Sequence, residues 1–305
     1  MKMKRYMTAD ELIEEAENAR ENFDFNIRLQ VFDQVEDITK TGAPYLKLTL
    51  RDRTNIIRNV KKWINKDTKD DLEIQRHKFS IGNILEIEGQ YNLKYGPSIT
   101  GSSLLTSEQY DLEDFVQTPE IDADSLFEFL SNTISKIQDS HLKILLEKIF
   151  SDDDIKKKFI ECPSSVIHHH SYKYGNLEHT IGMLKIFEQL IEHYNRNTNL
   201  NVDLIYTGII LHDIGKTLEY SLNNGVPKKN PGADLHGHLV LGAQLVSKYM
   251  NQIDDFPNDK KNQIRHLILS HHGKKEWDSV IEPQFPEAEI LHYLDMIDSR
   301  FKLNE

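Results

Sequence analysis

The sequence predicts an α+β protein with two domains, a small N-terminal β-barrel followed by an all-α domain. Residues 25–105 alternate between apolar and polar side chains, which is the period of half-buried strands. After residue 124, apolar side chains recur three and four positions apart, which is the period of helices. An acidic segment with a proline lies between the two patterns. The expected parts are an N-terminal helical extension (1–22), a barrel (23–108), a linker (109–123) and an all-α region (124–305) whose functional core spans 160–301.

Composition is that of a globular, acidic protein. The 305 residues are 38% apolar and 28% charged, and the net charge is −12 at pH 7. No window approaches the 18 uncharged apolar residues of a membrane span, and the first residues lack the apolar stretch of a signal peptide. Cys162 is the single cysteine, so no intrachain disulfide is expected. These features favour a cytoplasmic protein that does not bind membranes.

The first elements follow from local signals. Residues 8–20 predict a helix, because Thr8 suits its N-cap and Glu11 completes a capping box. Five strands are then expected, separated by Gly, Asn and Asp turns. They span residues 25–35, 42–52, 55–63, 83–95 and 98–105. Five short strands favour a small closed barrel of the OB type, which commonly binds single strands; an SH3-like barrel is the alternative.

A basic strip marks the barrel. Residues 47–66, "KLTLRDRTNIIRNVKKWINK", hold seven Lys or Arg and one Asp. A local basic strip on an acidic chain can follow a phosphate backbone, although a solvated strand face is the simpler interpretation. Aromatic residues of the barrel are either core residues or platforms on which bases stack; those considered are Tyr45, Trp63, Tyr91 and Tyr95. The candidate nucleic-acid-binding residues are Tyr45, Arg51, Arg58, Lys61, Lys62 and Trp63.

Histidines and aspartates recur in the helical half at particular places. Seven helical segments are expected, at 125–138, 141–151, 176–194, 202–216, 237–253, 262–272 and 288–301. The polar residues lie inside these segments or at their ends: His179, His212, Asp213, His238, His271, His272 and Asp295. Imidazole and carboxylate ligands together suit a borderline divalent ion such as Mn, Fe, Co, Ni or Zn. Each residue alone has a simpler interpretation as a hydrogen-bonded core or surface group, and only the ordered recurrence predicts a metal site.

Several stretches of the chain resemble a known family. The order of His179, His212–Asp213 and Asp295 is similar to that of the HD superfamily of metal-dependent phosphohydrolases. The stretches "HHHSYKYGNLEHT", "ILHDIGK", "GHLVLG", "ILSHHG" and "AEILHYLDMIDSR" resemble the YhaM-type 3′–5′ exoribonucleases more closely, and "TGAPYLKLTLRDRTN" is similar to the first barrel hairpin of that family. The resemblance covers residues 24–300. It implies an OB-type barrel ahead of an HD domain.

The resemblance also implies roles for individual residues. His179, His212, Asp213 and Asp295 would hold a first ion, with Mn²⁺ favoured. Asp213 would bridge to a second ion held by His238 and His271, with His272 as an alternate ligand. Two such ions activate water and hold a phosphodiester. Lys216 would neutralise charge on the phosphoryl oxygens, or else acts only as a cation at a helix C-terminus. His169 and His170 would contact the scissile phosphate or protonate the leaving group.

The expected function is therefore hydrolysis of single-stranded RNA, with single-stranded DNA as a second polymer, from the 3′ end to 5′-mononucleotides. Two alternatives stay open. One is hydrolysis of a small nucleotide, such as a cyclic dinucleotide or a dNTP, with the barrel in a regulatory role. The other is a non-catalytic nucleic-acid-binding protein. No P-loop or serine-nucleophile motif competes, and an assembly of identical chains is compatible with the sequence.

Overall fold

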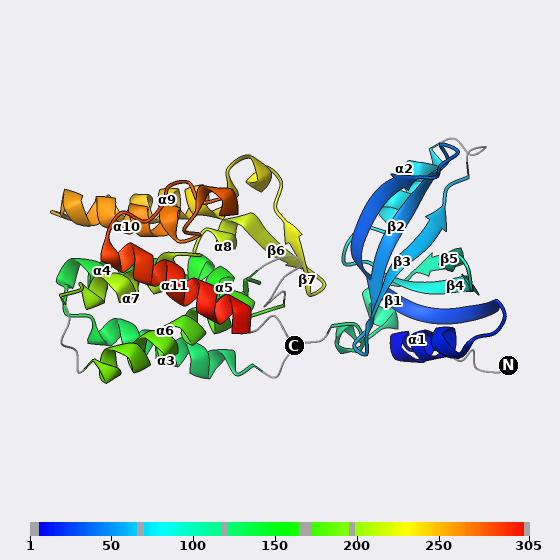
Figure 1. Cartoon of the computed structure of the whole chain (residues 1–305), viewed down its shortest axis with the longest axis horizontal. Coiled ribbons are helices and arrows are strands. Elements are labelled where there is room, and N and C mark those ends of the chain that lie inside the picture. The colour runs from blue at the N-terminus through cyan, green and yellow to red at the C-terminus, as the bar shows by residue number, and fades with distance from the viewer. Residues whose placement is uncertain (1–5, 66–69, 117–120, 165–171, 195–198, 302–305) are drawn as a thin grey trace. The chain divides into compact units, whose positions relative to one another are not determined.

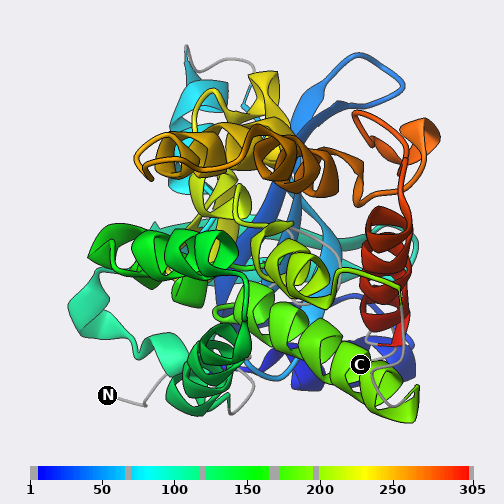
Figure 2. The same cartoon turned by 90° about the vertical axis from the view of Figure 1, so that its left-hand side faces the viewer.

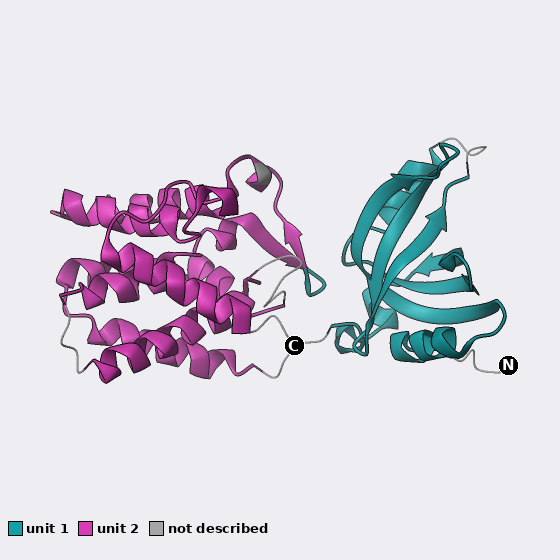
Figure 3. Cartoon of the chain, viewed as in Figure 1, with its two compact units in different colours: residues 1–119, 223–226 teal, residues 120–222, 227–305 magenta. Residues whose placement is uncertain are grey.

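A computed structural model describes residues 6–65, 70–116, 121–164, 172–194 and 199–301 (Figure 1). The chain divides into two compact units, Met1–Pro119 with Asn223–Val226, and Glu120–Leu222 with Pro227–Glu305 (Figure 3). The first unit is built on a barrel and the second on helices, so the predicted α+β class and the order of its parts are confirmed. The finer domain boundaries stay a prediction.

The barrel is closed by five strands in the order β1-β2-β3-β5-β4. Neighbouring strands are antiparallel except β3 and β5, which pair in parallel at Lys61 and Ser98. This arrangement is OB-like and agrees with the leading interpretation of the sequence. The strands are β1 (Phe23–Ile38), β2 (Pro44–Arg51), β3 (Ile56–Trp63), β4 (Ile84–Asn92) and β5 (Gly96–Leu104).

Two helices accompany the barrel. In α1 (Ala9–Asn18) the predicted capping box is present: the Glu11 amide donates to Thr8 Oγ1, and the Thr8 amide donates to Glu11 Oε2. Ala9 and Leu12 are buried in the barrel core, so the N-terminal extension belongs to the barrel unit. Helix α2 (Asp71–Lys78) was not predicted, because it has few apolar residues and buries none of them.

One glycine lets an aromatic ring fill the barrel core. Phe25 on β1 pairs with Gly89 on β4, and its ring is buried. A Cβ atom on Gly89 would lie 2.2 Å from Phe25 Cζ, which no carbon pair tolerates. The ring therefore occupies the space that a side chain at position 89 would need.

The second unit is helical, and its helices surround one apolar core (Figure 2). They are α3 (Ala123–Lys136), α4 (Ser140–Phe150), α5 (Asp153–Glu161), α6 (Gly175–His193), α7 (Val202–Leu211), α8 (Lys216–Glu219), α9 (Gly237–Met250), α10 (Asn258–Ser270) and α11 (Pro286–Phe301). All seven expected helical segments are found, although the one expected at 202–216 ends at Leu211, and α5 and the short α8 were missed. A two-stranded hairpin of β6 (Tyr220–Asn223) and β7 (Val226–Lys229) was missed too. Among the described helices, none has the length and apolarity that crossing a bilayer requires.

We predict that Gly89→Ala destabilises the barrel by about 1–3 kcal/mol, because the new methyl group overpacks the core against Phe25. The chain has two tryptophans, Trp63 and Trp277, one in each unit. Urea unfolding of a Trp277→Phe protein, followed by the fluorescence of Trp63, therefore reports on the barrel. Ser103→Ala, an exposed position on β5, is the matched control. Equal midpoints for the two variants would contradict the packing argument.

Candidate metal centre

The helical unit brings the predicted metal ligands together from five helices. His179 lies within α6 and Asp295 within α11. The others lie at helix ends: His212 and Asp213 follow α7, His238 is in the first turn of α9, and His271 and His272 follow α10. Each of these positions agrees with the sequence expectation.

The first cluster consists of His179, His212 and Asp213. Each offers a ligating atom, and the three atoms lie within 4.8 Å of one another. Asp295 adjoins this cluster, with its Oδ1 atom 3.3 Å from His179 Nε2. His179, His212 and Asp213 are buried. Two imidazoles and one carboxylate, with the partly exposed Asp295 beside them, form a ligand set suited to a borderline divalent ion.

The second cluster consists of His238, His271 and His272. Their ligating nitrogens also lie within 4.8 Å of one another, and the Nε2 atoms of His238 and His272 are 3.3 Å apart. His271 is buried, whereas His238 and His272 are partly exposed. This cluster is therefore the more accessible of the two.

The carboxylate of Asp213 joins the clusters. Its Oδ2 atom is 3.3 Å from His212 Nε2 in the first cluster. Its Oδ1 atom is 3.5 Å from the Nε2 atoms of both His238 and His271 in the second cluster. One carboxylate thus presents a different oxygen to each cluster, which is the geometry that a ligand shared by two ions requires.

All five histidines of the two clusters use the same ring nitrogen, Nδ1, for a hydrogen bond to an oxygen outside the clusters. Each ring has its Nδ1 atom within hydrogen-bond distance of an oxygen, so Nδ1–H donates and the Nε2 lone pair is left for the centre. The acceptors of His212 and His271 are the backbone oxygens of Ile209 and Ile268, at 2.8 and 2.9 Å. For His272 the acceptor is the backbone oxygen of Trp277, at 3.0 Å. For His179 and His238 the acceptors are the carboxylates of Asp298 and Glu219, at 2.7 and 2.8 Å.

These contacts allow a test of whether metal ions fit. Among the described residues, His212 Nε2 and Asp213 Oδ1 are buried and make no hydrogen bond of acceptable geometry. Buried acceptors without a partner are costly. The Nε2 atoms of His238 and His272 also face each other while both Nδ1 atoms are engaged elsewhere. A cation satisfies all of these lone pairs at once, so the residues fit divalent metal ions.

Burial and charge set the protonation of the centre. Burial alone would raise the pKa of Asp213, but Lys216 and His212 outweigh it and hold that pKa well below its usual value. Burial lowers the pKa of His271 to about 3, so this imidazole is neutral, as a metal ligand must be. Burial would also lower the pKa of His179, but Asp295 and Asp298 raise it to about 9. Metal binding at His179 therefore displaces a proton at neutral pH.

Two glycines make room for these side chains. A Cβ atom on Gly215 would lie 1.9 Å from the backbone oxygen of His238, so the start of α8 approaches α9 this closely only with glycine. A Cβ atom on Gly182 would lie 2.0 Å from Asp298 Oδ1, so this glycine of α6 admits the carboxylate that orients His179. The glycine of the stretch "HDIGK" thus has a packing role beside the metal ligands.

Other candidates of the helical unit are placed as follows. Lys216 Nζ lies 2.5 Å from Asp213 Oδ2, so its ammonium does reach the centre. The structure does not test its proposed role towards the phosphate. His169 and His170 lie outside the described residues.

The basic strip of the barrel does not form one surface, and two expectations need correction. Arg51 is only 7% exposed, and its Nε donates to Gln30 Oε1, so it is occupied inside the barrel unit. Burial also lowers the pKa of Arg51 to about 10. Lys62 pairs with the buried Leu46 and therefore faces inward, near Lys78 and Asp71 of α2. A bulge at Asn59, which has φ +60°, separates the two outward-facing residues Arg58 and Lys61.

Of the aromatic candidates of the barrel, some are exposed and one packs against the core. Tyr45 and Trp63 pair across β2 and β3, with ring centroids 5.2 Å apart, and Trp63 is 46% exposed. Tyr95 is exposed, and its backbone oxygen accepts from Lys61 Nζ. Tyr91 instead stacks on Phe23 and packs against the barrel core.

Two residues orient the ligands without having been assigned that role from the sequence: Asp298, which the sequence placed on one helix face with Asp295, and Glu219, which it did not select. Asp298 carries a usable signal, since it follows Asp295 by three positions on the same helix face. Glu219 carries no such signal, because its contact with His238 depends on how α8 meets α9.

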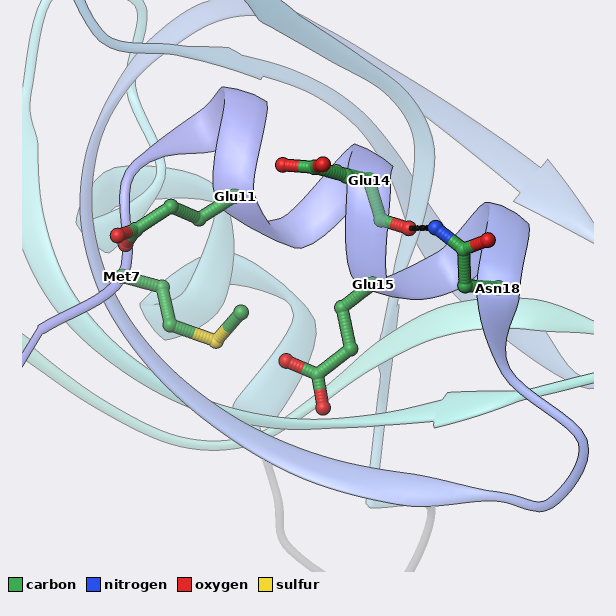
Figure 4. Close-up of a pocket in the computed structure, with 5 residues that line it drawn as sticks. All are labelled: Met7, Glu11, Glu14, Glu15 and Asn18. Atoms are coloured by element: carbon green, nitrogen blue, oxygen red, sulfur yellow. Dashed lines mark hydrogen bonds between the residues drawn. The ribbon is translucent and has the colours of Figure 1, made fainter.

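A different acidic hollow lies beside α1 in the barrel unit (Figure 4). It is lined by Met7, Glu11, Glu14, Glu15 and Asn18. Glu11 already serves the capping box, and the backbone oxygen of Glu14 accepts from Asn18. The hollow contains no imidazole, so its composition differs from that of the metal clusters.

We predict that Glu219→Gln and Asp298→Asn each weaken metal binding about 10–100-fold, because a carboxylate that orients a ligating histidine also raises its basicity. Isothermal titration of the metal-free proteins with Mn²⁺ measures this without relying on activity. Glu192→Gln, on the exposed surface of α6, is the matched control. Affinities equal to that of the control would show that these carboxylates do not support the metal ligands.

Comparisons with known proteins agree with this geometry. Residues 176–300 match the family model of the HD domain. A protein named 3′-5′ exoribonuclease YhaM from Listeria innocua is 28% identical over 279 residues, which cover 90% of this chain and 85% of that protein. Proteins of the same name from a Geobacillus species and from Oceanobacillus iheyensis are 27% and 29% identical, each over 92% of this chain and 85% of their own length. Residues 176–300 of the helical unit therefore match an HD domain, and about nine-tenths of the chain is similar to proteins named 3′-5′ exoribonuclease YhaM.

Proposed function

We propose that this protein is a metal-dependent exoribonuclease that degrades single-stranded RNA from its 3′ end to 5′-mononucleotides. The observation that carries the proposal is the carboxylate of Asp213, which presents one oxygen to each of two histidine clusters. The relatives that align along almost the whole chain are named for this activity. Together, the shared carboxylate and the relatives favour phosphodiester hydrolysis over a purely structural HD domain.

The residues divide the work as follows. His179, His212, Asp213 and Asp295 would hold one ion, and His238, His271 and Asp213 a second, with His272 available beside them. Bound Mn²⁺ or a similar ion supplies activated water near neutral pH and positive charge for the phosphodiester. Glu219 and Asp298 keep the imidazoles oriented. Lys216, whose ammonium lies 2.5 Å from Asp213 Oδ2, would neutralise negative charge that develops on the phosphoryl oxygens.

The barrel would hold the single strand. Its outward-facing candidates combine cations, Arg58 and Lys61, with two exposed aromatic rings, Trp63 and Tyr95. Lys61 precedes Trp63 by two positions on β3, and its Nζ donates to the backbone oxygen of Tyr95 and lies 5.9 Å from the centroid of that ring. Cations and exposed rings on the outside of the barrel match the alternating phosphates and bases of a single strand, RNA or DNA.

The activity is tested with a 5′-labelled oligoribonucleotide and Mn²⁺. We expect a ladder that shortens from the 3′ end, releases 5′-mononucleotides and stalls at a stable hairpin, because the bases must be unpaired to be gripped. Asp213→Asn should abolish the reaction while the circular dichroism spectrum is unchanged, since the shared ligand is lost without a change in size. Cleavage within a circular single strand, or hydrolysis of dNTPs or cyclic dinucleotides but not of RNA, would overturn the proposal.

Salt dependence tests the barrel surface. Replacing Arg58 and Lys61 together by Gln should raise KM for a long single strand. It should also reduce the slope of log binding against log salt by about 1.4, because two phosphate contacts no longer release counterions. A dinucleotide should be hydrolysed as before. Lys62→Gln is the informative comparison, because Lys62 is a neighbouring cation that faces inward. A slope that changes as much in Lys62→Gln would contradict the assignment of the outer face.

A further inference from the structure

Trp277 is an exposed tryptophan next to the second metal cluster. It ends a short 3-10 turn, Lys275–Trp277, that follows His271 and His272. Its backbone oxygen is the acceptor for His272 Nδ1, at 3.0 Å. The backbone that carries the indole is therefore bonded directly to a proposed metal ligand.

The indole is supported from one side. Its ring is tilted by 32° against the imidazole of His292, with centroids 5.9 Å apart. His292 is itself fixed, because its Nδ1 donates to the backbone oxygen of His271 at 2.8 Å. Gly273 allows this arrangement, since it has φ +83° and a Cβ atom there would lie 2.3 Å from His292 Cε1. The indole therefore packs against His292, and a hydrogen bond ties His292 to the backbone of the proposed metal ligand His271.

The indole is partly exposed, and the side chain of Lys274, which also lies 3.6 Å from Glu276 Oε1, covers part of it. Trp277 is 41% exposed, although exposing a large aromatic ring is unfavourable. The ammonium of Lys274 lies 4.7 Å from the ring centroid. An exposed aromatic ring with a cation over it complements a nucleotide, because the flexible Lys274 side chain can move from the ring to the phosphate and leave the ring face for the base.

We propose that Trp277 is a platform on which a nucleobase of the substrate stacks next to the metal clusters, with Lys274 facing its phosphate. This inference rests on the proposed function, since it names how the strand is bound at that same site. The platform selects for the presence of a base and tolerates any base, because each one has an aromatic face. It is separate from the candidate surface of the barrel, which lies in the other unit.

The test compares AMP with ribose 5-phosphate, which carries the same phosphate and no base. Neither contains a phosphodiester, so both can be titrated into the Mn²⁺-loaded protein. By calorimetry, AMP should bind about 5- to 100-fold more tightly than ribose 5-phosphate. In a Trp63→Phe protein, AMP should quench the fluorescence of Trp277, and ribose 5-phosphate should not. Trp277→Leu should remove the preference for AMP, and Trp277→Phe should retain part of it.

Tyr194→Leu is the matched control. Tyr194 is an exposed aromatic residue of the same unit, 63% exposed at the end of α6, and this variant should keep the full preference for AMP. Equal binding of the two probes to the unmodified protein, or an unchanged preference in a folded Trp277→Leu, overturns the inference. If the protein digests RNA but does not prefer AMP, the stacking role of Trp277 is refuted and the proposed exoribonuclease activity still stands. A Trp277-dependent preference without digestion would support the platform and refute the exoribonuclease.

Discussion

The centre depends on one buried carboxylate shared between imidazoles. Asp213 lies at the end of α7, where its two oxygens face different histidine clusters. Its negative charge is retained despite burial, because Lys216 and His212 lower its pKa. An anion in this place would be very unfavourable without cations around it. Divalent ions bound between Asp213 and the surrounding histidines would supply the positive charge that this buried anion needs.

The second constraint is the orientation of the rings. An imidazole ligates through one nitrogen, and the other must be occupied by an acceptor to fix the tautomer. Helix ends meet this need, because His212 and His271 donate to the carbonyls three residues before them. His179 and His238 are not at helix C-termini, and they use Asp298 and Glu219 instead. The helical fold thus supplies two of the five acceptors from helix-end carbonyls, and side chains or the following turn supply the other three.

The sequence predicted what depends on local periodicity and chemistry. Alternation gave the five strands, and three- and four-residue spacing gave most of the helices. The order of His179, His212–Asp213, His238, His271 and Asp295 predicted which side chains the structure brings together. Helices α2, α5 and α8 were missed because all three are short: α2 buries no apolar residue, α5 is rich in charged residues and buries only Ile155 and Phe159, and α8 has four residues. The β6–β7 hairpin was missed despite "NNG" at 223–225, a strong turn signal, because its strands are only four residues long.

Other features follow from tertiary contacts that no local pattern contains. Arg51 and Arg58 look alike in the basic strip, yet Arg51 is buried against Gln30 and Arg58 is exposed. The bulge at Asn59 changes which lysine faces outward, so strict alternation misassigns Lys62. Glu219 becomes part of the metal centre only because Gly215 allows α8 to approach α9.

Anomalous diffraction from a crystal of the Mn²⁺-loaded protein tests the central claim most directly. The account predicts two manganese peaks, one among His179, His212 and Asp295 and the other among His238, His271 and His272, with Asp213 contacting both. In crystals of Asp213→Asn, the occupancy of both peaks should fall. A single peak that does not contact Asp213, or two peaks that share no carboxylate, would contradict the account.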